Sequence, residues 1–136
     1  MKIDLKVITP EKIAYKGEVD QVTLPTQDGE ITVLANHIPL ISTMKHGELI
    51  VKNNGDIIPM AVRGGFVEVK GNSITIMTDI AERIEEIDEK KAEEARQRAQ
   101  KLLEDKDKLS DVTFAEATAT LEQSLARLKV LKRKRK

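Results

Sequence analysis

The chain has 136 residues, of which 40% are apolar and 2% aromatic, with a formal net charge of zero and no cysteine. Its length fits one domain, or a small domain with an appendage. The absence of cysteine excludes disulfides, thiol nucleophiles and cysteine-ligated metals, and two histidines are too few for a histidine metal cluster. The scarcity of aromatic side chains argues against nucleic-acid binding by base stacking.

The N-terminus, Met1-Lys2-Ile3-Asp4, is charged from its second residue, so we expect no signal peptide. No apolar run approaches the roughly 20 residues that span a bilayer. We therefore expect a soluble intracellular protein that associates with a membrane only through partners.

The first part of the chain has the pattern of short β-strands. Apolar and charged side chains alternate in residues 3–7, which predicts a strand with one buried face. Residues 19–24 form a second apolar segment, which Pro25 is expected to end. Residues 31–34 form a third, after the Asp-Gly turn signal at residues 28–29.

Two hairpins are expected further along. Turns at residues 53–55 and 71–72, rich in Asn and Gly, accept positive φ and should each join two strands: 49–51 with 57–62, and 66–69 with 74–77. Gly64-Gly65 lies within strand-like sequence and indicates a bulge or close backbone approach, or else a flexible connection. Short strands at this spacing predict a sandwich or barrel.

The second part of the chain is predicted to be helical, because every glycine and proline lies within the first 71 residues. Asp88 is expected to be the N-cap of a first helix. One face of this helix repeats at spacings of three and four and consists of Ala92, Ala95, Ala99 and Leu102. Residues 104–112 lose this face and should connect to a second helix.

The second helix is expected to begin at the capping-box pattern of residues 113–116 (Thr-Phe-Ala-Glu). Its predicted apolar face consists of Phe114, Ala117, Leu121, Leu125 and Leu128. Alanine offers a single methyl group, so we expect a hairpin that folds back readily but is held weakly and can detach. The predicted fold is α+β: an antiparallel β-sandwich in residues 1–84, followed by an antiparallel two-helix hairpin in residues 85–136.

Four motifs, in this order and spacing, resemble the epsilon subunit of bacterial F-type ATP synthases over the whole chain. They are Asp28-Gly29-Glu30, His37-Ile38-Pro39-Leu40, residues 63–69 (Arg-Gly-Gly-Phe-Val-Glu-Val) and residues 87–92 (Ile-Asp-Glu-Lys-Lys-Ala). The chain departs from the family pattern at Ala35-Asn36, where Pro-Gly is common, and at Thr32, where glycine is common. Asn36 tolerates a left-handed conformation, so the turn there should survive.

The resemblance implies a non-catalytic rotor subunit of the central stalk. The sandwich would bind the gamma subunit and the c-subunit ring. The hairpin would lie on the sandwich, or extend along gamma into the alpha/beta catalytic hexamer and hinder ATP hydrolysis. Such a subunit serves ATP synthesis driven by proton or other ion transport, and is peripheral at the cytoplasmic face of the cell membrane.

The resemblance also implies partner-binding residues. Glu30, His37 and Pro39 match positions on the surface that faces the c ring. The sequence alone favours a solvated turn glutamate and a structural histidine, whereas the resemblance favours the contact with the c ring. The basic C-terminus, Lys132, Arg133, Lys134, Arg135 and Lys136, is either a solvated terminus or binds an acidic loop of the catalytic beta subunit.

Some family members bind ATP through an Ile/Leu-Asp-x-x-Arg-Ala motif and arginines of the second helix. In this chain Ile87, Asp88 and Ala92 match, but Lys91 replaces the arginine and cannot form its bidentate contact. Arg127 falls near one expected helix-two arginine, whereas Gln123 falls near the other. We expect either weak, regulatory ATP binding or a plain helix cap at Asp88, and no other cofactor or metal.

Other function classes have less support. No Ser-His-Asp or Cys-His arrangement and no P-loop is present, so we do not expect an enzyme. The alternative is a small nucleic-acid-binding module that uses the basic C-terminal helix. Zero net charge and the scarcity of aromatic residues weigh against it.

Overall fold

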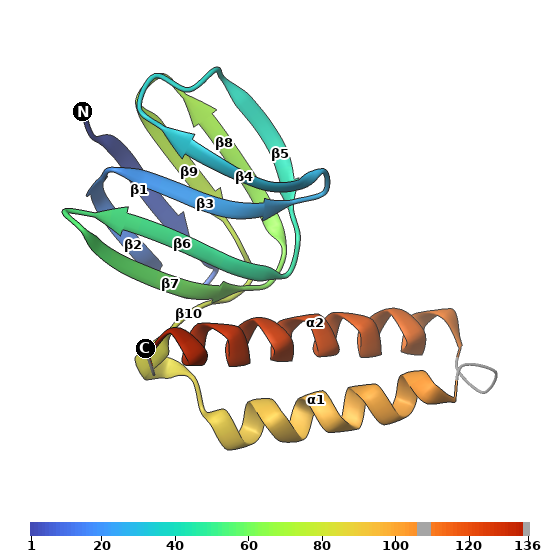
Figure 1. Cartoon of the computed structure of the whole chain (residues 1–136). Coiled ribbons are helices and arrows are strands. Elements are labelled where there is room, and N and C mark those ends of the chain that lie inside the picture. The colour runs from blue at the N-terminus through green and yellow to red at the C-terminus, as the bar shows by residue number, and fades with distance from the viewer. Residues whose placement is uncertain (106–109, 135–136) are drawn as a thin grey trace.

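The computed structural model describes residues 1–105 and 110–134, which form a β-sandwich with a helical hairpin packed on one end (Figure 1). The described residues contain ten strands, a 3-10 helix and two α-helices. These are β1 (Ile3–Ile8), β2 (Ile13–Val19), β3 (Gln21–Thr26), β4 (Gly29–Leu34), β5 (Leu40–Met44), β6 (Gly47–Asn53), β7 (Asp56–Val62), β8 (Gly65–Lys70), β9 (Ser73–Met77), β10 (Ala81–Arg83), η1 (Ile84–Glu86), α1 (Glu89–Glu104) and α2 (Asp111–Lys134).

The strands form one bent sheet that folds into two layers. Its order is β10-β7-β6-β3-β5-β8-β9-β1-β2, with β4 paired to β3 outside this path. The two layers join where β3 meets β5, through the single pair Thr26 and Met44. All pairs are antiparallel except that of β1 with β9, which is parallel. The predicted sandwich is confirmed, with this one parallel pair.

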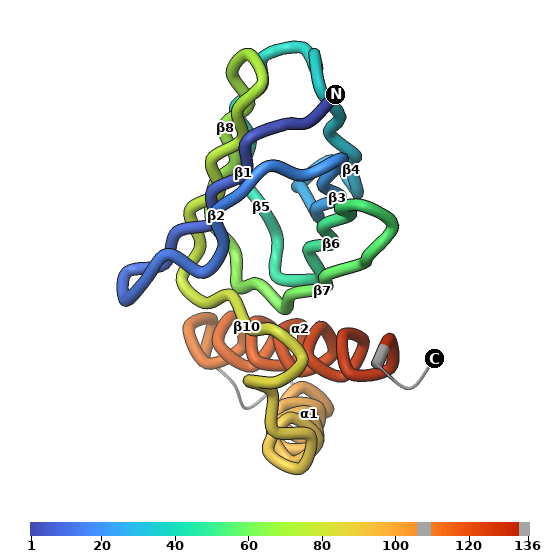
Figure 2. Tube along the Cα trace, turned by 90° about the vertical axis from the view of Figure 1, so that its left-hand side faces the viewer, coloured from blue at the N-terminus to red at the C-terminus, as the bar shows by residue number. Residues whose placement is uncertain are grey.

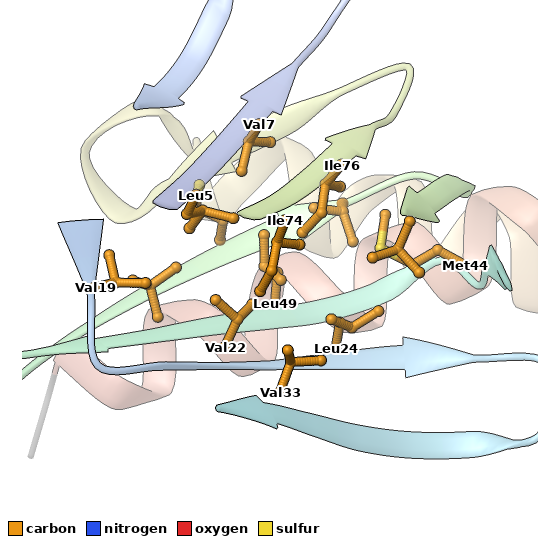
Figure 3. Packing of buried hydrophobic residues seen from close by; sticks show 14 of the residues in the cluster. Leu5, Val7, Val19, Val22, Leu24, Val33, Met44, Leu49, Ile74 and Ile76 are labelled. Atoms are coloured by element: carbon orange, nitrogen blue, oxygen red, sulfur yellow. The ribbon is translucent and has the colours of Figure 1, made fainter. Parts of the chain in front are cut away.

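The core of the sandwich lies between the two layers and consists of Ile, Val, Leu and Met side chains. Figure 3 shows side chains of both layers pointing toward one another, among them Leu5, Ile74 and Leu24. Burial alternates along several strands, as in β1, where Ile3, Leu5 and Val7 are buried. A fully buried side chain of this kind contributes about 1.5–3 kcal/mol, so the sandwich has a core of its own.

Pro25 does not end its strand as predicted, because it lies inside β3. Its carbonyl accepts a hydrogen bond from the backbone N of Lys45 at 3.0 Å, on the side away from β4. The missing N–H points to this same side. There β3 pairs with β6 only as far as Thr23, so no ladder hydrogen bond is lost.

Three strands were not predicted: β2, β5 and β10. Strand β2 shows no clear alternation, since only its last residue, Val19, is buried. Strand β5 follows the His37–Pro39 loop directly and has one buried residue, Met44. Strand β10 has only three residues. Each is held by its neighbours in the sheet, and pairing of this kind leaves little trace in a short sequence window.

Gly64 and Gly65 provide a close backbone approach, one of the two predicted alternatives. Their φ angles are 62° and 120°, in the region that favours glycine. A Cβ at Gly65 would lie 1.9 Å from the carbonyl oxygen of Met77 on the neighbouring strand. Asn36 has a φ of 66°, so the left-handed turn expected there is also confirmed.

Asp88 caps α1 as predicted, because its Oδ1 accepts a hydrogen bond from the backbone N of Lys91 at 3.1 Å. The predicted start of α2 at Thr113 is wrong. Ser110 is the cap: its Oγ accepts from the backbone N of Thr113 at 3.2 Å, and Asp111 in the first turn favours the helix dipole. Of the predicted connection, residues 106–109 lie outside the described residues.

The two helices are antiparallel, as predicted, and α2 lies between α1 and the sandwich (Figures 1 and 2). The predicted faces are only partly right. Ala92, Ala99 and Ala117 are buried, but Leu102, Phe114 and Leu125 are 41–48% exposed. Instead α2 buries Gln123, Ser124, Ala126 and Val130. A helix covered on two sides does not have the single apolar face that we assumed.

Candidate functional site

The hairpin meets the sandwich along a thin apolar seam. We use the name docking seam for Ala61 of β7, Ile87 of the linker between β10 and α1 (residues 84–88), and Ala126 and Val130 of α2, which pack together and are at most 9% exposed. Ile84 and Leu131 pack at its edges. Two of its four members are alanines, so the seam buries little apolar area compared with the sandwich core.

Three ion pairs, two of which share Glu48, lie beside the docking seam. Arg133 donates two hydrogen bonds to Glu48 of β6, from Nε to Oε2 at 2.6 Å and from Nη2 to Oε1 at 2.9 Å. Lys129 Nζ lies 3.9 Å from the same Glu48 carboxylate. Arg127 Nε donates to Oε1 of Glu82, on β10, at 2.6 Å. Helix α2 therefore binds the sandwich through charge-assisted hydrogen bonds as well as through the docking seam.

The Glu48 side chain is only 4% exposed, whereas that of Arg133 is 34% exposed. The hydrogen bonds that Arg133 donates to Glu48 are the main cause that raises the pKa of Arg133 above its ordinary value, outweighing the opposing effect of burial; the charges of Glu48 and Glu30 act in the same direction. A nearly buried carboxylate needs such a partner, because an unpaired charge there would be costly.

The linker between the two parts is fastened to the sandwich. The Arg83 guanidinium donates to the carbonyl of Ala14 at 3.1 Å and lies 5.3 Å from the centre of the Tyr15 ring. Lys12 Nζ donates to Glu86 Oε2 at 2.9 Å, and this contact lowers the pKa of Glu86. These contacts fix the linker as far as residue 86, three residues before α1 begins.

The predicted nucleotide-binding residues have roles within the protein. Ile87 belongs to the docking seam, Asp88 caps α1, and Ala92 is buried. Lys91 is exposed. Arg127 is paired with Glu82, and Gln123 is buried. The structure thus provides the plain helix cap at Asp88, and nucleotide binding stays a prediction.

The predicted partner-binding residues are spread over the molecule. Glu30, at the start of β4, is exposed and lines a cavity of about 280 Å³ with Glu48 and Lys129. His37 and Pro39 lie beyond the other end of β4, where His37 Nδ1 is 2.7 Å from the carbonyl oxygen of Ile38. Glu30 and His37 therefore do not form one cluster.

The basic terminus is only partly described. Arg133 is engaged by Glu48, Lys132 is exposed, and Lys134 is the last residue of α2. Arg135 and Lys136 lie outside the described residues. At least one residue of the basic terminus is therefore paired within the chain, with a residue that the sequence analysis did not single out.

An exposed apolar row on the sandwich was also missed. Ile13, Phe66 and Met77 are 48–54% exposed, and half-buried Ile8 pairs with Ile13 on one side and Met77 on the other. Phe66 pairs with Met77, so the four form a continuous row, here called the apolar row. The signal was present in the sequence, because these strands have apolar residues at outward-facing as well as inward-facing positions.

A cavity of about 520 Å³ lies alongside the apolar row. Its lining includes Phe66, Met77, Arg63 and His46. Within the described part of the chain, His46 Nδ1 is the buried side-chain polar atom without a hydrogen-bond partner. The cavity thus combines apolar side chains of the apolar row with polar and charged groups such as Arg63 and His46.

The chain belongs to a class of proteins in which a β-sandwich carries a C-terminal helical hairpin. Comparison with known families identifies this class. Residues 2–84 match the beta-sandwich domain of the ATP synthase delta/epsilon chain, and residues 85–132 match its long alpha-helix domain. The chain therefore belongs to the ATP synthase delta/epsilon chain family, and the resemblance to the epsilon subunit is confirmed.

Curated relatives and solved structures agree with this assignment. The chain is 39% identical to the ATP synthase epsilon chain of Herpetosiphon aurantiacus, over 99% of this chain and 98% of that one. It is 40% identical to that of Desulforamulus reducens, over 92% and 93%. A chain in the structure of the Euglena gracilis mitochondrial ATP synthase (OSCP/F1/c-ring) has a TM-score of 0.80 at 24% identity, covering 94% of this chain and 79% of that one.

Two further observations apply to residues 1–105 and 110–134. No helix there is both long and apolar enough to cross a bilayer. No group of three or more His, Cys, Asp or Glu side chains there is arranged to hold a metal ion.

Proposed function

We propose that this chain is a non-catalytic subunit of the central stalk of an ATP synthase, in which the sandwich is the rigid attachment and the hairpin is the regulatory element. The observation that carries this proposal is the contrast between the two parts. The sandwich has a complete core, whereas the hairpin rests on it through the docking seam and three ion pairs. An element held in this way can leave without unfolding its support.

The apolar row is the proposed contact with the gamma subunit. Exposed side chains such as Phe66 and Met77 form a contiguous apolar surface on a rigid sheet, and such patches on soluble chains mark interaction sites. His37 and Pro39, at the opposite end of β4 from the hairpin, are the proposed contacts with the c-subunit ring. Glu30 is less suited to that role in the docked arrangement, because it lies beside α2.

The hairpin is proposed to inhibit ATP hydrolysis when it extends along gamma into the alpha/beta catalytic hexamer. Its basic residues, including Lys132 and Arg133, would then bind acidic groups of the beta subunit. By the same proposal the chain serves ATP synthesis coupled to proton or other ion transport. It is peripheral at the cytoplasmic face of the cell membrane, which it reaches only through the complex.

ATP is proposed as a weak regulatory ligand at most. Lys91 supplies a single charge where a bidentate arginine would stand, and Arg127 would have to leave Glu82. Calorimetric titration of the isolated protein with ATP and Mg²⁺ tests this idea, and no heat at millimolar nucleotide would end it. Nucleic-acid binding gains nothing from the structure, because Arg127 and Arg133 are paired with carboxylates.

Reconstitution with gamma and the catalytic hexamer tests the regulatory role. The ATPase activity of complexes with the full chain is compared with that of complexes whose chain ends before Asp88. We expect higher ATP hydrolysis with the shortened chain and equal recovery of both chains with gamma. Equal hydrolysis at low ionic strength would contradict the inhibitory role.

The gamma contact has its own test. Phe66→Glu places a charge in the apolar row, and Thr75→Glu places the same charge one row away on the sheet. We expect the first variant to lose co-purification with gamma and the second to retain it, with both remaining folded by circular dichroism. Equal recovery of the two variants would place the gamma contact elsewhere.

A further inference from the structure

The docked hairpin depends on few contacts, and they are unequal. In the docking seam, Val130 and Ile87 are the only side chains larger than alanine among its four members. Helix α1 lies on the far side of α2 from the sandwich (Figure 2), so the hairpin meets the sandwich mainly through α2. The ion pairs of α2 must therefore account for much of what holds the hairpin in place.

We propose that the pair of Glu48 and Arg133, here called the latch pair, holds the hairpin on the sandwich and controls its release. This inference rests on the mobile hairpin of the proposed function and names the contact that regulates it. The latch pair joins β6 to the last turns of α2, across 85 residues of chain.

Three features distinguish the latch pair from the pair of Glu82 and Arg127. Its two hydrogen bonds engage both carboxylate oxygens, whereas Glu82 receives one. The Glu48 side chain is 4% exposed and that of Glu82 is 19% exposed. Lys129 adds a second positive charge 3.9 Å from Glu48. A bidentate, nearly buried contact is the stronger kind of ion pair.

When the hairpin leaves the sandwich, Glu48 and Arg133 lose their contact with each other. The Glu48 carboxylate gains water in place of the guanidinium, and Arg133 becomes available to another carboxylate. An acidic protein surface that binds the released face of α2 thus competes with Glu48 for the same side chain. Docking and binding to such a partner exclude each other, because one guanidinium cannot form both bidentate contacts.

Thiol labelling measures the release directly, because the chain has no cysteine of its own. Ala61→Cys, here called the seam reporter, places a thiol in the docking seam, 2% exposed under α2. Val67→Cys, here called the core reporter, places a thiol in the sandwich core, where only unfolding exposes it. The labelling rates of the two full-length reporter proteins, with a water-soluble disulfide reagent, give the opening of the seam and of the sandwich separately.

The latch pair is then removed by Glu48→Gln, which keeps the shape of the side chain. Glu68→Gln is the matched control, since Glu68 is exposed on β8 in the other layer. We expect Glu48→Gln to raise the labelling rate of the seam reporter about tenfold, with the core reporter unchanged and with no effect of Glu68→Gln. Arg133→Gln should raise the labelling rate at least as much as Glu48→Gln, because it leaves the nearly buried Glu48 carboxylate without its guanidinium, and the double variant should label no faster than Arg133→Gln alone.

The outcomes separate the latch pair from the proposed function. Equal labelling of the seam reporter with Glu48→Gln and Glu68→Gln, or additive effects in the double variant, would overturn the latch pair. So would a parallel rise at the core reporter, because it would show that Glu48 stabilises the sandwich itself. If the seam and core reporters react at one common rate in every protein, the hairpin never leaves a folded sandwich, and the mobile hairpin is refuted as well.

Discussion

Replacing Gly65 with alanine should destabilise the protein by about 4 kcal/mol. The φ of Gly65 is 120°, where an L side chain is strained, and its Cβ would lie 1.9 Å from the carbonyl oxygen of Met77. Ordinary contact begins near 3.4 Å, so the backbone of β9 would have to move by about 1.5 Å. That shift would disturb the ladder between β8 and β9, which includes the pair of Phe66 and Met77.

The neighbouring residue is a matched control. Gly64 also has a positive φ, 62°, but the nearest atom to its Cβ would belong to the His46 side chain at 3.5 Å, an ordinary contact. Gly64→Ala should therefore cost only the left-handed backbone term, about 1 kcal/mol. Urea unfolding followed by circular dichroism, with Tyr15 fluorescence as a second probe, measures both losses. Two losses within about 1 kcal/mol of each other would refute the clash with Met77.

Three further predictions concern the linker and the hairpin. Asp88→Ala removes the cap that accepts from Lys91 and should lower the free energy of unfolding by about 1 kcal/mol in urea; no change would show that the cap is dispensable. Lys12 lowers the folded-state pKa of Glu86, so their contact stabilises the protein above the unfolded-state pKa and is lost as pH falls through the lower folded value. The stability difference between the wild type and Glu86→Gln should therefore vanish on acidification, and a difference that grows toward acid would contradict this sign. Val130→Ala removes two methyl groups from a fully buried position and should speed amide exchange in α2 about tenfold, whereas unchanged exchange would show that the seam does not hold the hairpin.

Local signals predicted much of the fold. Turn residues such as Asn54-Gly55 and Asn36 adopt the positive φ angles that their types allow, and Asp88 caps its helix. Short exposed strands such as β2 and β5 were missed, because their positions depend on neighbours in the sheet. The parallel partner of β1 could not be predicted, since Asp4 meets Ser73 across most of the sandwich sequence.

The candidate site was less predictable than the fold, for a physical reason. Asp88 acts through a contact with Lys91, three residues further along the chain. The contact between Arg133 and Glu48 joins residues that are 85 positions apart in the sequence. A basic residue near a chain end suggests an acidic partner, and nothing in its neighbours shows that the partner lies in the same chain. The burial of Ala126 and Val130 on a second side of α2 could not be predicted for the same reason. The surface that covers these two residues comes from β7 and the linker, which are distant in the sequence.

The pairing of the first strand with the ninth also has a consequence for biosynthesis. Strand β1 lies between β2 and β9, so the layer cannot close until residues 73–77 have been made. On the ribosome, the N-terminal segment must therefore wait with a single neighbour while the intervening strands emerge. The helices are translated last, directly after strands β9 and β10. They therefore emerge while the sandwich that they pack against is still completing its sheet.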